Sequence, residues 1–498
     1  PDSRQGLPYH RLLRHKATMT ERPFRWMLPQ HDASPCPARG GGALWFGSGL
    51  EGFVQRGAPV LSKERRNMGT KAEPRYRDVD ILTFRGTIAP DTPCCPECGG
   101  ALHRNGTAPC MLLHIPIGGT LSRLCIERQR MRCPECGWCR ADPIPFRAEG
   151  HMCTEALARY AEGLLAYGFT LKETAHVTGL CRNAVKDIGR KRLERLWLED
   201  GPKDGQRRLR LPDRPPKRIG IDEFKLHDGH RYATIIADLE TGHVLWVAHG
   251  RKKQVVHGFV ERAGMERMAG VEAVASDMNS DYQEAFLELC PHLDIVYDHF
   301  HIVKDFSEKV ISEVRKDIQR ELVRKGGREA ARKLKRTKYL LMSSAGTRAR
   351  WEREAEEGRP AERGAELFGK PERLRKPGAQ SRYEELMEGN ELLLACDLVK
   401  EKLRDACTLS STEEMACAIR DTIRICRETG DSHFAWFARL LESHFGGIVA
   451  HARHRISTGR VEGTNNLIKT LRRKGYGYPD DDYFFLKIVD ASYRKDRY

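Results

Sequence analysis

The stretch "KRIGIDEFKLHDGHRYATIIADLETGHVLWVAHG", residues 217–250, decides the fold. Its β-branched run leads into Asp222 and Glu223, and two further apolar runs follow on either side of a Glu-Thr-Gly-His turn. Runs of this composition separated by turn residues predict a meander of three strands. The chain then predicts a helix over about 255–268, a strand over 273–276 that ends at Asp277, a second helix, and a last strand in "LDIVYDHFHIVK".

This order of elements, β-β-β-α-β-α-β, is that of an RNase H-like domain. In such a sheet the first and fourth strands are neighbours, so Asp222 and Asp277 can converge on one divalent ion. An aspartate at a strand end is also common turn chemistry, which is the alternative for each residue alone. Two aspartates at the expected places in this strand order favour a metal site.

A second stretch, "STGRVEGTNNLIKTLRRKGYGY" at residues 457–478, carries a single acid, Glu462, among basic side chains. As a helix with about 100° per residue, it gathers an apolar face from Val461, Ile468 and Leu471. A separate face carries Glu462, Asn465, Asn466, Lys469 and Arg473. A carboxylate aligned with amide and basic side chains suits metal binding beside a phosphate backbone, so we predict Glu462 as a third ligand. The alternative is a solvated surface glutamate.

Three such carboxylates suit two Mg²⁺ ions about 3.5–4 Å apart, held by hard oxygen ligands. Ions held in this way would activate a water or a 3′-OH and stabilise the leaving oxygen.

Paired cysteines predict a second kind of metal site. Each of two C-x-x-C motifs is followed by Gly, and the ligands of one tetrahedral Zn²⁺ would be Cys95, Cys98, Cys133 and Cys136. The segments "LHIPIGG" and "CIERQRMRC" between the motifs read as strands able to bring them together. Cys94 and Cys139 are adjacent alternatives, and buried free thiols are the non-metal interpretation.

The stretch "TLKETAHVTGLCRNAVKDI", residues 170–188, fits a helix-turn-helix in which Gly179 makes the turn. Arg182 and Asn183 open the second helix, and Lys186 and Arg190 are expected to face outward toward DNA. The alternative is an ordinary helical hairpin.

Composition limits the partners. The chain has 85 Lys+Arg against 69 Asp+Glu, a formal charge of +16, which favours a polyanion such as nucleic acid. No run of about 18 apolar residues is present, which excludes a membrane-spanning helix, and the N-terminus does not resemble a signal peptide. Clustered cysteine pairs then indicate metal binding in a reducing cytoplasm.

Residues 1–67 are rich in Gly, Pro and Arg without sustained periodicity, so we expect little stable structure there. We interpret Met68 as the natural start and 1–67 as a non-native extension, the alternative being a disordered basic arm. The expected order continues with a zinc-binding domain (68–150), the helix-turn-helix (151–200), a Pro-rich linker (201–217), the first part of the core (218–304), a helical insertion (305–455), and the last part of the core (456–498).

From about Asp91 to the end, the chain resembles the DDE transposases of the bacterial insertion-sequence family ISL3. The motifs that carry the resemblance are CPECGG…CPECG, TLKETAHVTGLCRNAVKDI, GIDEFKLHDGHRYATIIADLETGHVLW, SDMNSDY, DHFHIVK and ISTGRVEGTNNLIKTLRRKGYGY. The resemblance implies an α/β fold with small zinc and all-α modules, in which Asp222, Asp277 and Glu462 form the DDE triad. It adds Asp298 and His301 near the catalytic centre; for His301 a core or phosphate-contacting role is the alternative.

The resemblance also implies a function. The protein would bind the terminal inverted repeats of its element, cut and rejoin DNA with Mg²⁺ or Mn²⁺, and hold a structural Zn²⁺. Its partners would be double-stranded repeat and target DNA, and we expect a homodimer or higher oligomer on DNA in the bacterial cytoplasm, at the nucleoid. The predicted DNA contacts are Arg182, Asn183, Lys186, Arg190, Asn465, Lys469 and Arg473. The insertion would contact DNA ends or a second subunit, or serve as a solvated scaffold.

Two competing functions keep part of this description. A general RNase H-like nuclease would use the same carboxylates without an end-binding domain. A zinc-containing DNA-binding regulator derived from a transposase would bind DNA without cutting it. Specific binding to inverted repeats separates the first from a transposase, and metal-dependent nicking separates the second.

Overall fold

The computed structural model describes residues 49–67, 74–88, 94–200, 207–362, 373–374, 376–456 and 459–494. The chain divides into two units, Pro1–Gly52 and Phe53–Tyr498. Every element below belongs to the second unit. The expectations for residues 1–48 and for Met68 as a start fall outside the described residues.

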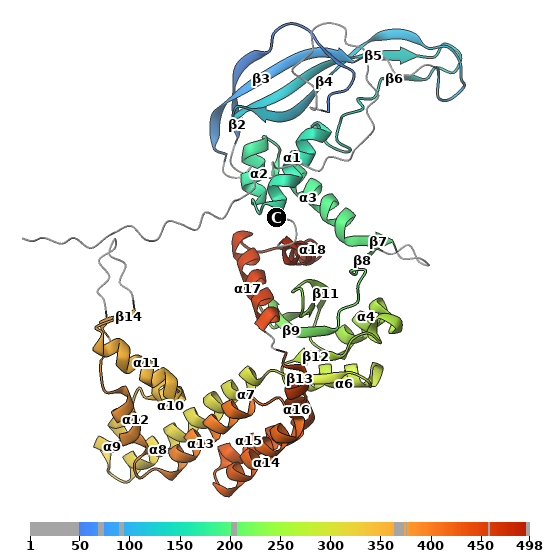
Figure 1. The fold of residues 1–498 in the computed structure, drawn as a ribbon. Helices are drawn as coiled ribbons and strands as arrows, with labels where there is room; N and C mark the ends of the chain where they lie inside the picture. Colours follow the sequence, from blue (N-terminus) through green and yellow to red (C-terminus); the bar gives the residue numbers. More distant parts are fainter. Residues whose placement is uncertain are drawn as a thin grey trace, which may run out of the picture. The chain divides into compact units, whose positions relative to one another are not determined.

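The N-terminal part of this unit is a six-stranded sheet with the strand order β1-β3-β5-β4, in which β2 also pairs with β3 and β6 with β5 (Figure 1). Its strands are β1 (Phe53–Gln55), β2 (Val60–Asn67), β3 (Tyr76–Ile88), β4 (His103–Ile117), β5 (Thr120–Arg132) and β6 (Cys139–Ala141). The β4–β5 pair is antiparallel and runs from Ile117↔Thr120 to His103↔Arg132. The predicted strands between the cysteine motifs are therefore present, and their far ends lie side by side.

Strands β1 and β2 correct the expectation of little stable structure across residues 1–67. All eight residues of β2 pair with β3, from Val60↔Thr83 to Asn67↔Tyr76. Alternate side chains of β2 are half-buried, and two of them have specific partners: Glu64 forms an ion pair with Arg123, and Arg66 donates to the Gly179 carbonyl at 3.4 Å. The period of two is carried by charged side chains, so an apolar–polar pattern does not reveal it.

Three helices follow: α1 (Glu155–Ala166), α2 (Leu171–Thr178) and α3 (Arg182–Trp197). Thr170 and Glu173 form a capping box at the start of α2, and Gly179 ends this helix with φ 72°. Leu157, Val185 and Ile188 are buried in the shared core, as their helical spacing predicts. The hairpin of β7 (Leu198–Asp200) and β8 (Arg207–Leu209) comes next, so part of the expected linker is a strand.

The central sheet has the strand order β11-β10-β9-β12-β13. Its elements are β9 (Arg218–His227), β10 (Arg231–Asp238), β11 (Val244–His249), α4 (Lys253–Ala263), α5 (Met265–Met268), β12 (Ala273–Ser276), α6 (Ser280–Leu289) and β13 (Asp294–Tyr297). The predicted strand order is confirmed, including the pairing of the first strand with the fourth. One predicted helix is divided in two at Gly264, where φ is 80°, and the last strand ends at Tyr297, earlier than expected.

The two faces of this sheet have separate cores. Ile219, Ile221 and Val274 pack with α4 and α6 on one face. Phe224, Ala273 and Ala275 pack on the other face with α17 (Gly459–Lys474) and α18 (Asp481–Ser492). Figure 1 shows both of these C-terminal helices beside the strands β9 to β11. Helices α17 and α18 thus cover the face toward which the even-numbered residues of β9 point.

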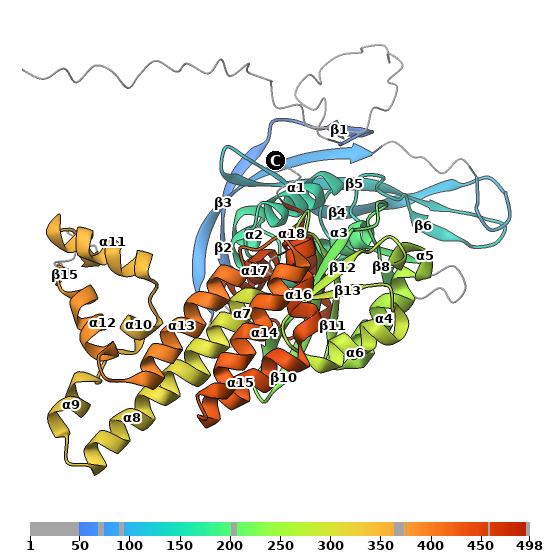
Figure 2. The same ribbon diagram turned by 60° about the horizontal axis from the view of Figure 1, so that its bottom comes forward.

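The predicted helical insertion leaves the sheet after β13. It contains α7 (His299–Asp305), the π-helical η1 (Phe306–Ile311), α8 (Ser312–Arg324), α9 (Arg328–Lys333), α10 (Lys338–Met342), α11 (Ala345–Glu356), β14 (Pro360–Glu362), β15 (Arg373–Leu374), α12 (Ala379–Met387), α13 (Glu391–Ala406), α14 (Thr412–Glu428), α15 (Ser432–Ser443) and α16 (Phe445–His454). Figure 2 shows α13 returning beside α7 and α8. Gly447 of α16 lies against the ring of Tyr297, so the insertion ends next to the strand from which it began.

None of the helices in the described part of the chain is both long and apolar enough to span a membrane.

Candidate active site and metal centre

Asp222 of β9 and Asp277, the residue directly after β12, lie at the same end of two neighbouring parallel strands. The last pair in the register of β9 and β12 is Gly220 with Ala275, and each aspartate comes two residues after its member of that pair. Both positions point to the face covered by α17, because side chains alternate along a strand. The structure therefore brings these two predicted site residues together.

The two carboxyl groups influence each other electrostatically. The pKa of Asp222 is raised to about 6, chiefly by burial and also by the negative charge of Asp277, while the Glu223 N–H and His301 oppose the rise. Burial also raises the pKa of Asp277, with a further contribution from Asp305 and an opposing one from His301. Desolvation and like-charge repulsion both disfavour the ionised forms. Ionising both aspartates therefore costs free energy, and a bound cation would offset that cost.

Asn465 of α17 is the closest partner of this pair from the C-terminal helices. Its side-chain amide donates a hydrogen bond of 2.6 Å to Asp222 Oδ2, and the residue is buried. Val461 of the same helix fits against Gly220, where a Cβ would collide with it. The sequence analysis predicts Asn465 as a DNA contact. In the structure its side chain faces Asp222, and the sequence analysis missed this hydrogen bond.

Glu462 lies one helical turn before Asn465 and is exposed to solvent. Within the described ranges, the only group of three or more Cys, His, Asp or Glu whose ligand atoms lie within 4.8 Å of one another is formed by cysteines. The structure thus does not gather Glu462 with both aspartates, and the three-carboxylate site stays a prediction. The apolar face of α17 is confirmed, because Val461, Ile468 and Leu471 are buried.

His301 and Asp298 have different roles in the structure. His301 acts on both aspartates by its charge, and its Nδ1 is buried without a hydrogen-bond partner among the described residues. Asp298 is buried and caps α7 by accepting a 2.9 Å hydrogen bond from the Phe300 N–H. Of the two residues, His301 is the one that faces the carboxylate pair.

Further polar atoms around the pair lack partners. Glu223 Oε2, Ser276 Oγ and Asn465 Oδ1 are buried, and no described residue bonds to them. Glu223 and Ser276 directly neighbour the two aspartates in the chain, and the pKa of Glu223 is raised by burial and by Asp277. Sequence reasoning missed both because no spacing marks them. Because side chains alternate along a strand, Glu223 and Ser276 point to the opposite face of the sheet from the two aspartates. The two carboxyl groups and Asn465 Oδ1 on the α17 face are the oxygen ligands that fit a hard divalent cation such as Mg²⁺ or Mn²⁺.

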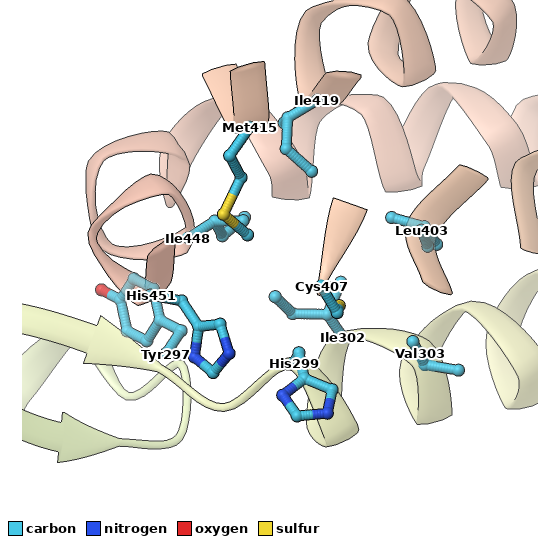
Figure 3. Close-up of a pocket in the computed structure, with 10 residues that line it drawn as sticks. All are labelled: Tyr297, His299, Ile302, Val303, Leu403, Cys407, Met415, Ile419, Ile448 and His451. Carbon is cyan, nitrogen blue, oxygen red and sulfur yellow. The ribbon is translucent and has the colours of Figure 1, made fainter. Parts of the chain in front are cut away.

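A small apolar cavity of about 10 Å³ lies between α7 and the helices α13, α14 and α16 (Figure 3). His299 of α7 and His451 of α16 face each other there, with ring centroids 5.0 Å apart. Burial lowers the pKa of His451, and the nearby His299 lowers it further. Leu403, Met415 and other apolar side chains complete the lining. The cavity has room for about one water molecule, so it is a packing feature and not a substrate site.

The four predicted zinc ligands form one compact cluster. Cys95 Sγ lies 3.5 Å from Cys136 Sγ, and Cys98 Sγ lies 3.5 Å from Cys133 Sγ. A tetrahedral site with Zn–S bonds of about 2.3 Å needs sulfur atoms about 3.8 Å apart, so the cluster fits Zn²⁺ with little adjustment. Hydrogen bonds from the N–H groups of its own loop, chiefly that of Cys136, lower the pKa of Cys133 to about 7.

The two cysteine loops have matching backbones. The Gly99 N–H donates to the Cys95 carbonyl at 2.8 Å, and the Gly137 N–H donates to the Cys133 carbonyl at 3.0 Å. Both glycines adopt left-handed φ angles of 75° and 79°. Neither alternative ligand belongs to the cluster. Cys94 is exposed, and Sγ of Cys139, on strand β6, accepts a hydrogen bond from the side-chain amide of Asn105 on strand β4.

The helix-turn-helix geometry is present, but two of its predicted DNA contacts point elsewhere. Arg182 and Asn183 are exposed at the start of α3. Lys186 Nζ and Arg190 Nη1 both lie 2.9 Å from Asp480 Oδ2, at the start of α18. The expectation that Lys186 and Arg190 face outward is therefore wrong, because a carboxylate nearly 300 residues later in the chain binds them both.

The known proteins to which this chain is similar are transposases. A family described as transposase matches residues 219–488, which covers more than half of the 498 residues and runs from β9 into α18. The transposase for insertion sequence element IS1001 of Bordetella parapertussis is 28% identical over 399 residues, 80% of this chain and 88% of that protein. The transposase for insertion sequence element IS1557 of Mycobacterium tuberculosis is 27% identical over 277 residues, 53% of this chain and 57% of that protein.

Proposed function

The chain belongs to the ISL3 family of DDE transposases, and from that premise we propose that it binds the terminal inverted repeats of its own insertion sequence and performs metal-dependent strand cleavage and strand transfer. Membership in a transposase family implies an enzyme that acts on DNA. We further propose which residues bind the metal and which modules recognise the DNA.

One observation carries the proposal for the catalytic centre: two half-buried carboxyl groups, Asp222 of β9 and Asp277 directly after the adjacent parallel strand β12, lie close together beside a basic helix. This helix, α17, contributes Asn465 to Asp222 and ends in Arg472, Arg473 and Lys474. A sheet with the order β11-β10-β9-β12-β13 is compatible with an RNase H-like core, which we propose as its fold.

Asp222 and Asp277 would hold the divalent cation, with Glu462 as the third ligand. When bound, Mg²⁺ or Mn²⁺ would lower the pKa of a water or 3′-OH and offset charge on the leaving oxygen. Asn465 fixes the rotamer of Asp222 by its hydrogen bond. His301 partly opposes the rise in the pKa of both aspartates, and so favours the ionised form that would bind a cation.

The N-terminal modules would recognise the DNA ends. Arg182 and Asn183 are exposed at the start of α3 and would reach base edges in a major groove. The four-cysteine cluster would hold a structural Zn²⁺, and with four thiolates it leaves no open coordination position for catalysis. Because two element ends must be cut together, we propose a homodimer or higher oligomer on DNA, acting in the bacterial cytoplasm.

Cleavage of a labelled duplex that carries the terminal repeats of the host element tests this proposal. With Mg²⁺, the wild-type protein should nick the DNA at the repeat boundary, and Asp222→Asn and Glu462→Gln should not. Asp228→Asn and Glu261→Gln are matched controls, because both side chains are exposed, outside the site, and should leave cleavage intact. Equal cutting of unrelated DNA would instead indicate a general nuclease.

A second candidate, a DNA-binding regulator derived from a transposase, is favoured by one observation: Glu462 is not gathered with the aspartates. In that case the wild-type protein would bind the repeats specifically and would not nick them with either Mg²⁺ or Mn²⁺. The same assay therefore separates the two candidates.

A further inference from the structure

The end of α17 carries an open hollow that the catalytic proposal does not use. It has a volume of about 550 Å³ and is lined by Lys469, Arg472, Arg473, Tyr476 and Gly477. Lys469 and Arg473 are exposed, and no carboxylate in the described ranges forms an ion pair with either. Arg472 instead donates to the Lys225 carbonyl at 3.0 Å, which holds the helix end on β9. The hollow is thus positively charged and fixed to the central sheet.

Tyr476 at the rim of this hollow is unusual in two independent respects. Its side chain is fully exposed, at 100% of its possible area, although an aromatic ring is normally at least partly covered. Its backbone is left-handed with φ 51°, a conformation that is sterically unfavourable for a residue with a bulky side chain. Such outliers are concentrated at functional sites because the surrounding structure must enforce them.

The surrounding turn does enforce this conformation. The N–H groups of Tyr476 and Gly477 donate to the carbonyls of Arg473 and Arg472 at 3.2 and 3.1 Å. Tyr478 attaches the turn to α18, because its ring stacks on Phe484 of that helix with ring centroids 4.6 Å apart. Gly475 has no room for a side chain beneath that ring. The turn therefore holds one tyrosine inward and presents the other to solvent.

We infer that this hollow binds an unpaired nucleotide of a DNA strand, whose base stacks on Tyr476 while Lys469 and Arg473 contact the adjacent phosphates. Basic grooves with aromatic platforms bind single strands in this way, since every base offers an aromatic face. In a duplex those faces are already covered by neighbouring base pairs, so a lone exposed ring has no partner there. The ring therefore discriminates for an unpaired nucleotide.

The inference rests on the proposed function, which supplies the DNA strand, and it adds a position along that strand. Arg473 lies eight residues after Asn465 on the same helix, about 12 Å along the axis at about 1.5 Å per residue. At about 3.4 Å per nucleotide step, this distance corresponds to roughly three to four nucleotides. The unpaired nucleotide would thus lie a few positions from the phosphate at Asp222.

Binding of the full-length protein to a fluorescent 12-nucleotide oligothymidine and to a 12-base-pair duplex, without added divalent metal, tests the inference. Tyr476→Ala should weaken oligothymidine binding roughly tenfold and leave duplex binding nearly unchanged. Tyr476→Phe keeps the ring and should bind like the wild type. If Tyr476→Ala binds oligothymidine as tightly as the wild type, or weakens both ligands by the same factor, the inference is wrong.

A second readout reports stacking directly. A single 2-aminopurine within the oligothymidine should lose fluorescence on binding to the wild type and to Tyr476→Phe, and should stay bright with Tyr476→Ala. Equal quenching by all three proteins would overturn the stacking role. Neither readout involves cleavage, so a protein that stacks the base without nicking repeats refutes the proposed function alone, and one that nicks repeats without stacking refutes this inference alone.

Discussion

The two metal sites of this protein are assembled to different degrees. The four cysteine sulfurs already lie within 4.8 Å of one another, whereas only two of the three expected carboxylates are gathered. Carboxylates repel one another, and a third charge beside Asp222 and Asp277 would raise the cost further. The contrast teaches that four thiols at metal-ligand spacing define one compact site, while the carboxylate pair carries an electrostatic cost that a hard cation would offset.

The largest expected effect concerns the cysteine cluster. Cys133→Ser should lower bound zinc from about one ion per chain to none and unfold the cysteine loops, because structural zinc in finger peptides contributes about 10–16 kcal/mol. Metal analysis of the purified protein measures this loss. Cys139→Ser is the matched control, since Cys139 lies outside the cluster and should leave zinc unchanged. Full zinc in Cys133→Ser would show that the cluster is not the binding site.

The carboxylate pair predicts a pH dependence of stability. The pKa of Asp222 rises on folding from 3.8 to about 6, so the native state binds more protons between these values and stability falls as pH rises through them. The shift corresponds to about 3 kcal/mol, which is the expected gain of Asp222→Asn over the wild type at pH 7 relative to pH 3. Denaturant unfolding of both metal-free proteins at several pH values measures it. If the difference in unfolding free energy between the two proteins does not change with pH, the pKa of Asp222 is not raised on folding.

A divalent cation should offset the cost of ionising the carboxylate pair. Ca²⁺, a hard cation that takes oxygen ligands, should stabilise the wild type at pH 8 by about 2.7 kcal/mol at a concentration 100 times its Kd. At pH 4.5 the stabilisation should shrink, because protons compete for the carboxylates. Thermal unfolding with and without Ca²⁺ measures both values. Equal stabilisation of Asp222→Asn would place the cation elsewhere.

The smallest effect separates two adjacent asparagines of α17. Asn465→Ala removes the donor to Asp222 and should cost about 1.5 kcal/mol, since hydrogen bonds to charged groups contribute about 1.5–3 kcal/mol. It should also move the pH midpoint of the stability change upward, which a purely structural loss would not do. Asn466→Ala changes an exposed side chain and is the control. An unshifted midpoint in Asn465→Ala would mean that the hydrogen bond does not act on Asp222.

Much of the architecture could be predicted because its signals are local. The β-branched runs predicted the order of the central sheet, the helical spacing predicted the buried face of α17, and the C-x-x-C loops predicted the cysteine cluster. Strand β2 was missed because charged residues such as Glu64 and Arg66 fill its inward positions.

The site was harder to predict because its partners are distant in the chain. Asp480 binds Lys186 across 294 residues, and Asn465 binds Asp222 across 243 residues, and no spacing rule reports such pairs. The unpartnered oxygen atoms of Glu223 and Ser276 emerge only once the sheet is folded. Sequence therefore identified the residue types and their faces, and the structure identified which of them meet.

Cleavage of the protein backbone by bound Fe²⁺ can show whether Asp222, Asp277 and Glu462 surround one metal ion. With Fe²⁺ in place of Mg²⁺, ascorbate and peroxide generate radicals that cut the chain within reach of the ion. In the presence of repeat DNA, our account predicts cuts near Asp222, Asp277 and Glu462 together, all lost in Asp222→Asn. Cuts near the two aspartates without any near Glu462 would show that the third carboxylate does not join the site, and would contradict the account.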